Sequence, residues 1–210
     1  MLEKAMVTTR RGKYTHVQYA RFADDLVVLI DSHPRHDWLV KAVERRLREE
    51  FAKLGVEINE EKSRMVDLSQ GESFAFLGFE YRRVLSRKRK WRVQYVPRLK
   101  KRTALLAKLR EIFHRYVSQP IGRVIERINP VLRGWVNYFA VGHSSRCFSF
   151  VKDWVERKIR RHLMRARQRP GFGWNRWSKT WLYEKLGLFH EYRLRRSEPH
   201  LKAQPLEAAT

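Results

Sequence analysis

Residues 14–30, YTHVQYARFADDLVVLI, contain two runs rich in β-branched and aromatic side chains, one on each side of Asp24 and Asp25. Such runs favour extended strands, and aspartate is common where a chain reverses direction. We therefore expect a β-hairpin with the two acids at its turn. Adjacent carboxylates repel each other unless a cation offsets their charge. Because Mg²⁺ takes oxygen ligands, the pair suggests a phosphoryl-transfer site, with an ordinary aspartate-containing turn as the simpler alternative.

The sequence around this hairpin predicts further strands and one covering helix. After Pro34, apolar residues recur at helical spacing, and Gly55 stands where a left-handed C-terminal cap belongs. The residues of this apolar face are Leu39, Val43, Leu47, Phe51 and Leu54. Short strands are predicted at residues 56–58, 64–68, 74–81 and 91–96, which makes the first half of the chain α+β in class.

From residue 98 onward the apolar residues recur at helical spacing. They predict one helix with Leu99, Leu106, Leu109, Phe113 and Tyr116, a second with Ile121, Val124, Ile125 and Ile128, and a third with Phe148, Val151, Val155, Ile159 and Leu163. Pro130 predicts a helix break, with Asn129 as the N-cap of a new helix. We expect Trp135, Tyr138 and Phe139 in the core of an all-α bundle whose surface is basic.

The charge of the chain is concentrated in its second part. The sequence has 46 basic and 22 acidic residues, a formal net charge of +24. Residues 1–85 hold 15 basic and 14 acidic residues, net +1, while residues 86–210 hold 31 and 8, net +23. Such an excess indicates a polyanionic partner. We divide the chain into residues 1–85, a basic connector and strand at 86–97, a helical domain at 98–190 and a tail at 191–210.

Composition excludes several classes of protein. Cys147 is the one cysteine, so an internal disulfide and a thiolate zinc site are excluded. No apolar run approaches the roughly 20 residues that a membrane span needs, and the N-terminus does not resemble a secretory signal.

Four motifs, in order along the chain, resemble one protein family. Residues 19–25, YARFADD, resemble the Tyr/Phe-Ala-Asp-Asp hairpin of reverse transcriptases, particularly those encoded by group II introns and their bacterial relatives. Residues 54–63, LGVEINEEKS, are similar to the next polymerase motif, and residues 76–79, FLGF, to the segment that grips the primer end. Residues 128–139, INPVLRGWVNYF, closely match the maturase-specific region that serves as the thumb.

The resemblance implies a partial polymerase palm followed by a basic helical maturase/thumb domain. Asp24 and Asp25 are then catalytic carboxylates that bind Mg²⁺, or Mn²⁺ as its substitute. Lys62 is a candidate acid toward the leaving pyrophosphate, with an ordinary solvated lysine as the alternative. Phe22 and Ala23 would lie near the primer terminus or the nucleotide. Leu77 and Gly78 would belong to the primer grip, where a glycine at a β-bulge is the alternative.

The basic residues are candidates for contact with RNA. We select those of the basic connector and of the exposed helix faces: Arg87, Lys88, Arg89, Lys90, Lys100, Lys101, Arg102, Arg157, Arg160, Arg161, Arg165 and Arg167. By resemblance, the partners are structured group II intron RNA and primer-template nucleic acid in the bacterial cytoplasm.

The family palm also has a third metal-binding aspartate on an earlier strand, whereas residues 1–23 contain one acid, Glu3. We therefore expect little polymerisation by this chain alone. Three alternatives remain open: half of a split enzyme whose partner polypeptide carries the remaining palm and finger segments, a fragment from an interrupted reading frame, or a retained RNA-binding remnant. Two functions follow from the resemblance: part of an RNA-directed DNA polymerase, or a non-catalytic RNA-binding maturase remnant that aids splicing. A basic protein of ribosomal or chromatin type, with an incidental hairpin, is the third reading.

Overall fold

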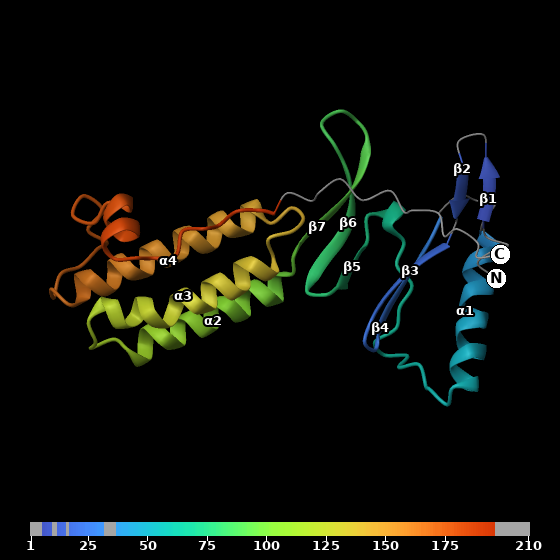
Figure 1. Cartoon of the computed structure of the whole chain (residues 1–210), viewed down its shortest axis with the longest axis horizontal. Helices are drawn as coiled ribbons and strands as arrows, with labels where there is room; N and C mark the ends of the chain where they lie inside the picture. The colour runs from blue at the N-terminus through green and yellow to red at the C-terminus, as the bar shows by residue number, and fades with distance from the viewer. Residues whose placement is uncertain (1–5, 10–11, 16, 32–36, 196–210) are drawn as a thin grey trace, which may run out of the picture. The chain divides into compact units, whose positions relative to one another are not determined.

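The computed structural model describes residues 6–9, 12–15, 17–31 and 37–195. The chain divides into two compact units, Met1–Phe76 and Leu77–Thr210 (Figure 1). Antiparallel strands with one helix among them come first and three long helices follow, so the α+β class is confirmed. The division between the units precedes the charge boundary at Leu85, because the strands just before and after that residue belong to the helical unit.

Two strand pairs form the first part of the first unit. β1 (Met6–Thr9) pairs with β2 (Gly12–Thr15), and β3 (Val17–Phe22) pairs with β4 (Asp25–Ile30), both antiparallel. The register of the second pair runs from Val17 opposite Ile30 to Phe22 opposite Asp25. The predicted hairpin is confirmed, with Ala23 and Asp24 as the two turn residues and Asp25 as the first residue of β4.

Helix α1 (Asp37–Lys53) packs its apolar face against the β3–β4 hairpin. Leu39 and Val43 are buried against Val17, and Val28, Ile30 and Leu47 pack around these three. The helix ends in a Schellman motif, in which Gly55 N–H donates to the Ala52 carbonyl at 3.1 Å and Val56 N–H to the Phe51 carbonyl at 2.9 Å. Gly55 has φ 64°, as predicted for the cap. Leu54 lies beyond the helix and is 73% exposed, so its assignment to the packed face is wrong.

The strands predicted at residues 56–58 and 64–68 are wrong. Both segments are irregular, and the next regular elements are the 3₁₀ turn η3 (Leu68–Gln70) and β5 (Ser73–Phe76). An apolar run becomes a strand when it has a neighbouring strand and a face to bury. Val56 and Met65 are 53% and 71% exposed, so neither segment has such a face.

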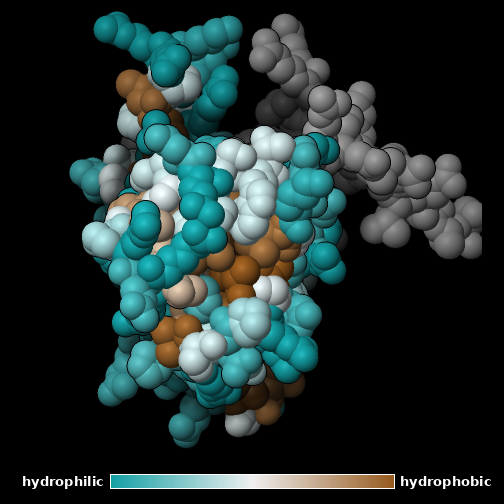
Figure 2. All heavy atoms as spheres, turned by 90° about the vertical axis from the view of Figure 1, so that its left-hand side faces the viewer, coloured by the Kyte–Doolittle hydropathy of each residue, from teal (hydrophilic) through white to brown (hydrophobic). Residues whose placement is uncertain are grey.

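The second unit joins one β-hairpin to three long helices. β6 (Phe79–Leu85) pairs with β7 (Trp91–Pro97), and residues 86–90 form the connecting turn. α2 (Leu99–Arg115), α3 (Ile121–Tyr138) and α4 (Ser145–Arg165) then lie side by side (Figure 1), and η4 (Trp181–Lys185) is a single π turn. Hydrophilic side chains cover most of the end of this unit that faces the viewer in Figure 2, and hydrophobic ones reach that surface in small patches.

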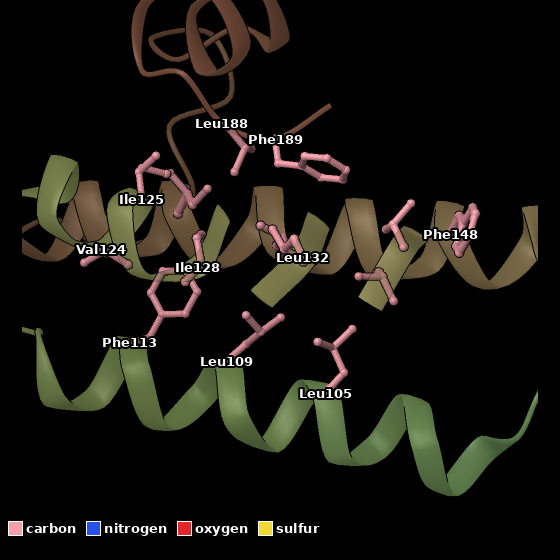
Figure 3. Close-up of a cluster of buried hydrophobic side chains, with 14 of the residues drawn as sticks. Leu105, Leu109, Phe113, Val124, Ile125, Ile128, Leu132, Phe148, Leu188 and Phe189 are labelled. Atoms are coloured by element: carbon pink, nitrogen blue, oxygen red, sulfur yellow. The ribbon is translucent and has the colours of Figure 1, made fainter. Parts of the chain in front are cut away.

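The core of the second unit lies between the three helices. Phe113 of α2 points toward Val124 and Ile128 of α3, and Leu105 and Leu109 of α2 point into the same cluster (Figure 3). Burial of a large apolar side chain contributes about 1.5–3 kcal/mol, and this cluster contains residues with no exposed surface: Leu109, Val124, Ile128, Leu132, Val151, Val155, Ile159 and Leu182. The predicted helix faces are confirmed except for Leu99, which starts α2 and is 60% exposed, while Leu105 takes a core position instead.

The helix break predicted at Pro130 is wrong, because α3 continues through it. A proline inside a helix costs about 3 kcal/mol, since it removes a backbone donor and its ring crowds the preceding turn. The apolar face on both sides of Pro130 keeps one helical register and offsets this cost: Val124, Ile125, Ile128, Leu132 and Val136 are all buried. Asn129 lies within the helix rather than capping one.

Asn129 instead ties the C-terminal segment to α3. Its amide nitrogen donates to the Gly187 carbonyl at 2.8 Å, and its amide oxygen accepts from Phe189 N–H at 2.9 Å. Further along, Arg195 N–H donates to the Ala140 carbonyl at 2.7 Å. Residues 191–195, assigned by sequence to the tail, therefore contact the helices, and residues 196–210 lie outside the described residues.

A buried ion pair lies at the end of the same core. Glu156 and Arg160 of α4 are 2% and 1% exposed, and Arg160 Nη1 lies 3.2 Å from Glu156 Oε2. The second oxygen of Glu156 accepts from the Tyr183 hydroxyl at 2.5 Å, and Arg160 Nε donates to the Trp177 carbonyl at 3.0 Å. The pair therefore connects α4 to the segment that follows it.

We expect Glu156→Ala to lower the free energy of unfolding by about 3–5 kcal/mol, because it leaves the Arg160 guanidinium buried without a counter-charge. Glu126→Ala is the matched control, since Glu126 pairs with Arg123 on the surface at 3.2 Å and both side chains are more than 60% exposed. Its effect should stay within about 1 kcal/mol. Urea unfolding followed by circular dichroism measures both, and equal effects would contradict the structural role of the buried pair.

Candidate functional site

The turn between β3 and β4 holds its acids in a constrained backbone. Ala23 has φ 53°, a left-handed conformation that costs a residue with a side chain about 1–2 kcal/mol. Arg21 Nε donates to the Ala23 carbonyl at 2.9 Å and stabilises this conformation. Strained backbone of this kind is concentrated at functional sites.

Asp25 and Phe22 lie opposite each other on the face of the hairpin that α1 does not cover. The α1 face carries Val17, Val28 and Ile30, and side chains alternate between the two faces of a strand. Phe22 is 61% exposed, and Asp24 and Asp25 are also exposed. The hairpin therefore presents an aromatic ring beside two carboxylates to solvent.

The two carboxylates suit a cation that is shared with a substrate better than one enclosed by this chain. In the described part of the chain, no group of three or more His, Cys, Asp or Glu side chains is placed to hold a metal ion. Asp24 and Asp25 offer oxygen ligands, and Mg²⁺ is usually bound by one or two carboxylates together with waters and substrate phosphates. Their chemistry suits Mg²⁺ if the remaining ligands come from the substrate or from another polypeptide.

Lys62 lies in an exposed turn after α1. Its backbone N–H donates to Asn59 Oδ1 at 3.1 Å, and Ser63 N–H donates to the Asn59 carbonyl at 2.9 Å, so Asn59 shapes this turn. Among the described residues, no hydrogen bond or ion pair joins the Lys62 side chain to Asp24 or Asp25.

Leu77 and Gly78 form a turn that is anchored to the helices of the second unit. Both have positive φ, 49° and 77°, as in a type I′ turn. The Leu77 carbonyl accepts from the Tyr138 hydroxyl at 2.9 Å, and the Gly78 carbonyl accepts from Arg98 N–H at 2.9 Å. Tyr138 is 56% exposed, so its assignment to the core is wrong, whereas Phe139 is buried as expected.

A groove of about 500 Å³ follows α2 and α3 beside this turn. It is lined by basic, small and aromatic residues: Lys101, Ala104, Leu105, Lys108, Pro130, Val131, Gly134, Trp135, Tyr138 and Phe139. Of these lining residues, none is acidic. The buried indole nitrogen of Trp135 has no hydrogen-bond partner in the described part of the chain. The two lysines, with no acid among the lining residues, suit an anionic ligand.

The first turn of α2 carries basic residues where a helix favours acidic ones. Lys100, Lys101 and Arg102 follow the N-terminus, and this turn contains no acid. Positive charge near a helix N-terminus opposes the helix dipole and costs about 0.3–1 kcal/mol for each charge. Arg102 lies over the Phe150 ring at 4.4 Å, while Lys100 and Lys101 face solvent. This arrangement costs stability and leaves positive charge available to a partner.

The tip of the β6–β7 hairpin presents a second group of cations. Arg87, Lys88, Arg89 and Lys90 are all exposed, and Arg89 has φ 53°. Behind the tip, Arg83 lies 4.5 Å from the centroid of the Trp91 ring, which is 56% exposed.

Helix α4 carries the third group, with one correction. Arg157, Arg161 and Arg165 of the helix are exposed, and so is Arg167 just after its end. The expectation that Arg160 contacts RNA is wrong, because Arg160 is 1% exposed and paired with Glu156. Helical periodicity places Arg160 outside the apolar stripe of α4, which predicts an exposed side chain. The segment after α4 folds over that face and buries it.

Two family models match the chain. Residues 2–81 match the reverse transcriptase (RNA-dependent DNA polymerase) family, and residues 102–181 match the group II intron maturase-specific domain. A search of the curated proteins found no match. Among the described residues, no helix is long and apolar enough to cross a membrane.

We expect Lys100→Glu to stabilise the chain by about 1 kcal/mol, because it replaces a charge that opposes the helix dipole with one that favours it. Lys108→Glu is the matched control, since this exposed residue lies in the middle of α2 and the net charge changes equally. Thermal unfolding at low salt compares the two variants. Equal stability would show that general charge repulsion, and not the helix terminus, sets the cost.

Proposed function

Because the chain belongs to the family of group II intron reverse transcriptases and maturases, we propose that its second unit binds structured intron RNA. We further propose that Asp24 and Asp25 supply two carboxylates to a metal-dependent nucleotidyl-transfer site. The observation that carries the first proposal is the excess of exposed, unpaired cations on the helical unit.

Among the described residues of the second unit, most cations form no ion pair with a carboxylate. Within the described residues, its ion pairs join Arg115 to Glu111, Arg123 to Glu126 and Arg160 to Glu156. None of them involves the hairpin tip or the first turn of α2. Neutralised phosphates release counterions, so each such cation adds to RNA affinity and to its salt dependence.

Repulsion among these cations supports the same proposal. Lys158 of α4 is partly buried and lies 5.3 Å from the centroid of the Trp154 ring. Partial burial, and then the charges of Arg110 and Arg161, lower the pKa of Lys158. A phosphate beside these three residues would relieve the repulsion, which favours polyanion binding on this face.

Cation–aromatic pairs on the same unit suit nucleic acid in a second way. Arg83 with Trp91, and Arg102 with Phe150, each place a guanidinium over a ring at about the 4.5 Å distance of a stacking contact. Exposed rings and guanidinium planes are the surfaces on which RNA-binding proteins stack unpaired bases. The unit therefore offers both phosphate and base contacts.

In the catalytic part of the proposal, Asp24 and Asp25 hold the cation, which when bound offsets the charge of the reacting phosphates. Phe22, on the same face as Asp25, provides an apolar surface for a nucleotide or primer end. Lys62 is the proposed proton donor to the leaving pyrophosphate. The Leu77–Gly78 turn holds the primer end, and palm and finger segments that these 210 residues do not contain complete the site.

A non-catalytic RNA-binding maturase is the second candidate. The observation that favours it is the distribution of charge, because residues 86–210 carry net +23 while residues 1–85, which hold the two carboxylates, carry net +1. The helical unit can then hold RNA without any help from the hairpin. Both candidates need the same RNA-binding surface and differ in whether a cation binds at Asp24 and Asp25.

For RNA binding, we expect the triple variant Arg157→Glu, Arg161→Glu, Arg165→Glu to lower the salt dependence of affinity for a structured intron RNA. The slope of log affinity against log salt should fall by roughly 0.7–0.9 for each phosphate that the variant no longer neutralises. The matched control replaces the same three residues with lysine, which keeps the charge and should keep most of the slope. An unchanged slope in the glutamate variant would remove α4 from the RNA interface.

For metal binding, we expect Mn²⁺ to broaden the NMR signals of residues near the β3–β4 turn, and Asp24→Asn/Asp25→Asn to abolish this effect, because the amides bind hard cations poorly. Asp37→Asn is the control, since Asp37 is exposed at the start of α1. Equal broadening in all three proteins would contradict a cation site at the hairpin and favour the non-catalytic maturase.

A further inference from the structure

The loop after α4 forms a basic pocket that neither family resemblance nor helical periodicity identifies. The pocket has a volume of about 420 Å³, within the range of small-ligand sites. It is lined by Met164, Arg167, Arg169, Gly173, Trp174, Asn175 and Arg176. These residues lie at the end of the helical unit that Figure 2 shows from outside.

The pocket is built on buried anchors. The guanidinium of Arg160, paired with Glu156 in the core, lies 4.4 Å from the centroid of the Trp174 ring. The same guanidinium donates to the Trp177 carbonyl at 3.0 Å, and Trp177 is buried. The ion pair therefore holds the loop at two points, and the pocket does not depend on a ligand for its shape.

A tight turn at Gly173 brings the pocket residues together. Arg176 and Trp177 both donate their N–H groups to the Gly173 carbonyl, at 3.1 and 3.0 Å. Gly173 has φ 60°, and a Cβ there would lie 2.6 Å from the Trp177 ring. Glycine is required at this position, so the turn is specified by packing as well as by conformation.

The chemistry of the pocket combines a stacking surface with unpaired cations. Trp174 is 50% exposed and lines the pocket. Arg167, Arg169 and Arg176 pair with no carboxylate among the described residues, and none of the lining residues is acidic. Asn175 adds an amide that both donates and accepts hydrogen bonds. A planar aromatic group attached to a phosphate matches all three features.

We propose that this pocket takes one unstacked nucleotide of a bound RNA, with its base on Trp174 and its phosphate at Arg167, Arg169 and Arg176. The proposal rests on the proposed RNA binding and adds the form of RNA that is recognised. Bases inside a duplex are already stacked, whereas those in bulges, loops and ends are free to leave the stack. The pocket therefore selects RNA with an unpaired nucleotide near a helix.

The test uses the full chain and two RNA hairpins that differ by one bulged 2-aminopurine nucleotide. We expect the wild-type protein to bind the bulged hairpin more tightly and to quench its fluorescence. Trp174→Ala should abolish the quenching and weaken binding of the bulged hairpin by about 5- to 140-fold, the equivalent of one base stack. Trp174→Phe should keep much of both effects, because it keeps an aromatic surface.

Two further variants keep the proposal falsifiable should Trp174→Ala disturb the loop. Trp38→Ala removes another exposed tryptophan, on α1, and should leave the preference for the bulged hairpin unchanged. Arg176→Gln should weaken binding of the bulged hairpin and reduce its salt dependence by the equivalent of one phosphate.

Failure of this proposal is distinguishable from failure of RNA binding itself. Tight binding of both hairpins with no preference for the bulge, or a preference that survives Trp174→Ala, would overturn the nucleotide pocket alone. Binding of neither hairpin would overturn the proposed function. A competition experiment adds a glutamate-rich peptide to the complex with the bulged RNA. If the peptide displaces the RNA and quenches the fluorescence of Trp174, the pocket binds an acidic protein segment and the proposal is overturned.

Discussion

The buried ion pair between Glu156 and Arg160 determines how the second unit presents its surface. Glu156 is one of 8 acids among residues 86–210, against 31 basic residues, and it is 2% exposed. Well-packed apolar residues often stabilise a core as much as a buried ion pair does. This pair also positions the segment after α4. Glu156 accepts a hydrogen bond from Tyr183, while Arg160 donates to the Trp177 carbonyl and lies over the Trp174 ring. One pair inside the core thus positions the whole segment that folds over the end of α4.

The surface around that core carries charge at a cost to stability. Basic residues occupy the first turn of α2, and partial burial together with positive neighbours lowers the pKa of Lys158. In a protein selected for stability alone, both arrangements would be unfavourable. A polyanionic partner, such as the RNA that we propose, would turn the same features into favourable contacts. The first unit differs, since the arginines of α1 pair with glutamates on the same helix face.

Local patterns in the sequence predicted much of the fold. The β3–β4 hairpin, the α1 cap at Gly55 and the apolar faces of α2, α3 and α4 all follow from periodicity and turn chemistry. The wrong predictions concern residues whose conformation or burial depends on contacts with segments far away in sequence. Pro130 stays within α3 because burial on both sides outweighs the local cost, and Arg160 is buried because residues 174–183 cover it. Tyr138 is 56% exposed, and its hydroxyl bonds to Leu77, far away in sequence. The sequence marks the pocket at Trp174 with nothing more than a glycine-containing loop next to arginines.

Lysine footprinting tests most directly whether the second unit is the part of the chain that holds RNA. The full chain is acylated with and without a structured intron RNA at moderate salt, and the modified lysines are identified by mass spectrometry. Binding by the second unit predicts strong protection of Lys88, Lys90, Lys100 and Lys101, which are all exposed on it. Lys41 and Lys53, exposed on α1, should react equally in both samples. Protection of Lys41 and Lys53 with no protection of the other four would contradict RNA binding by the second unit.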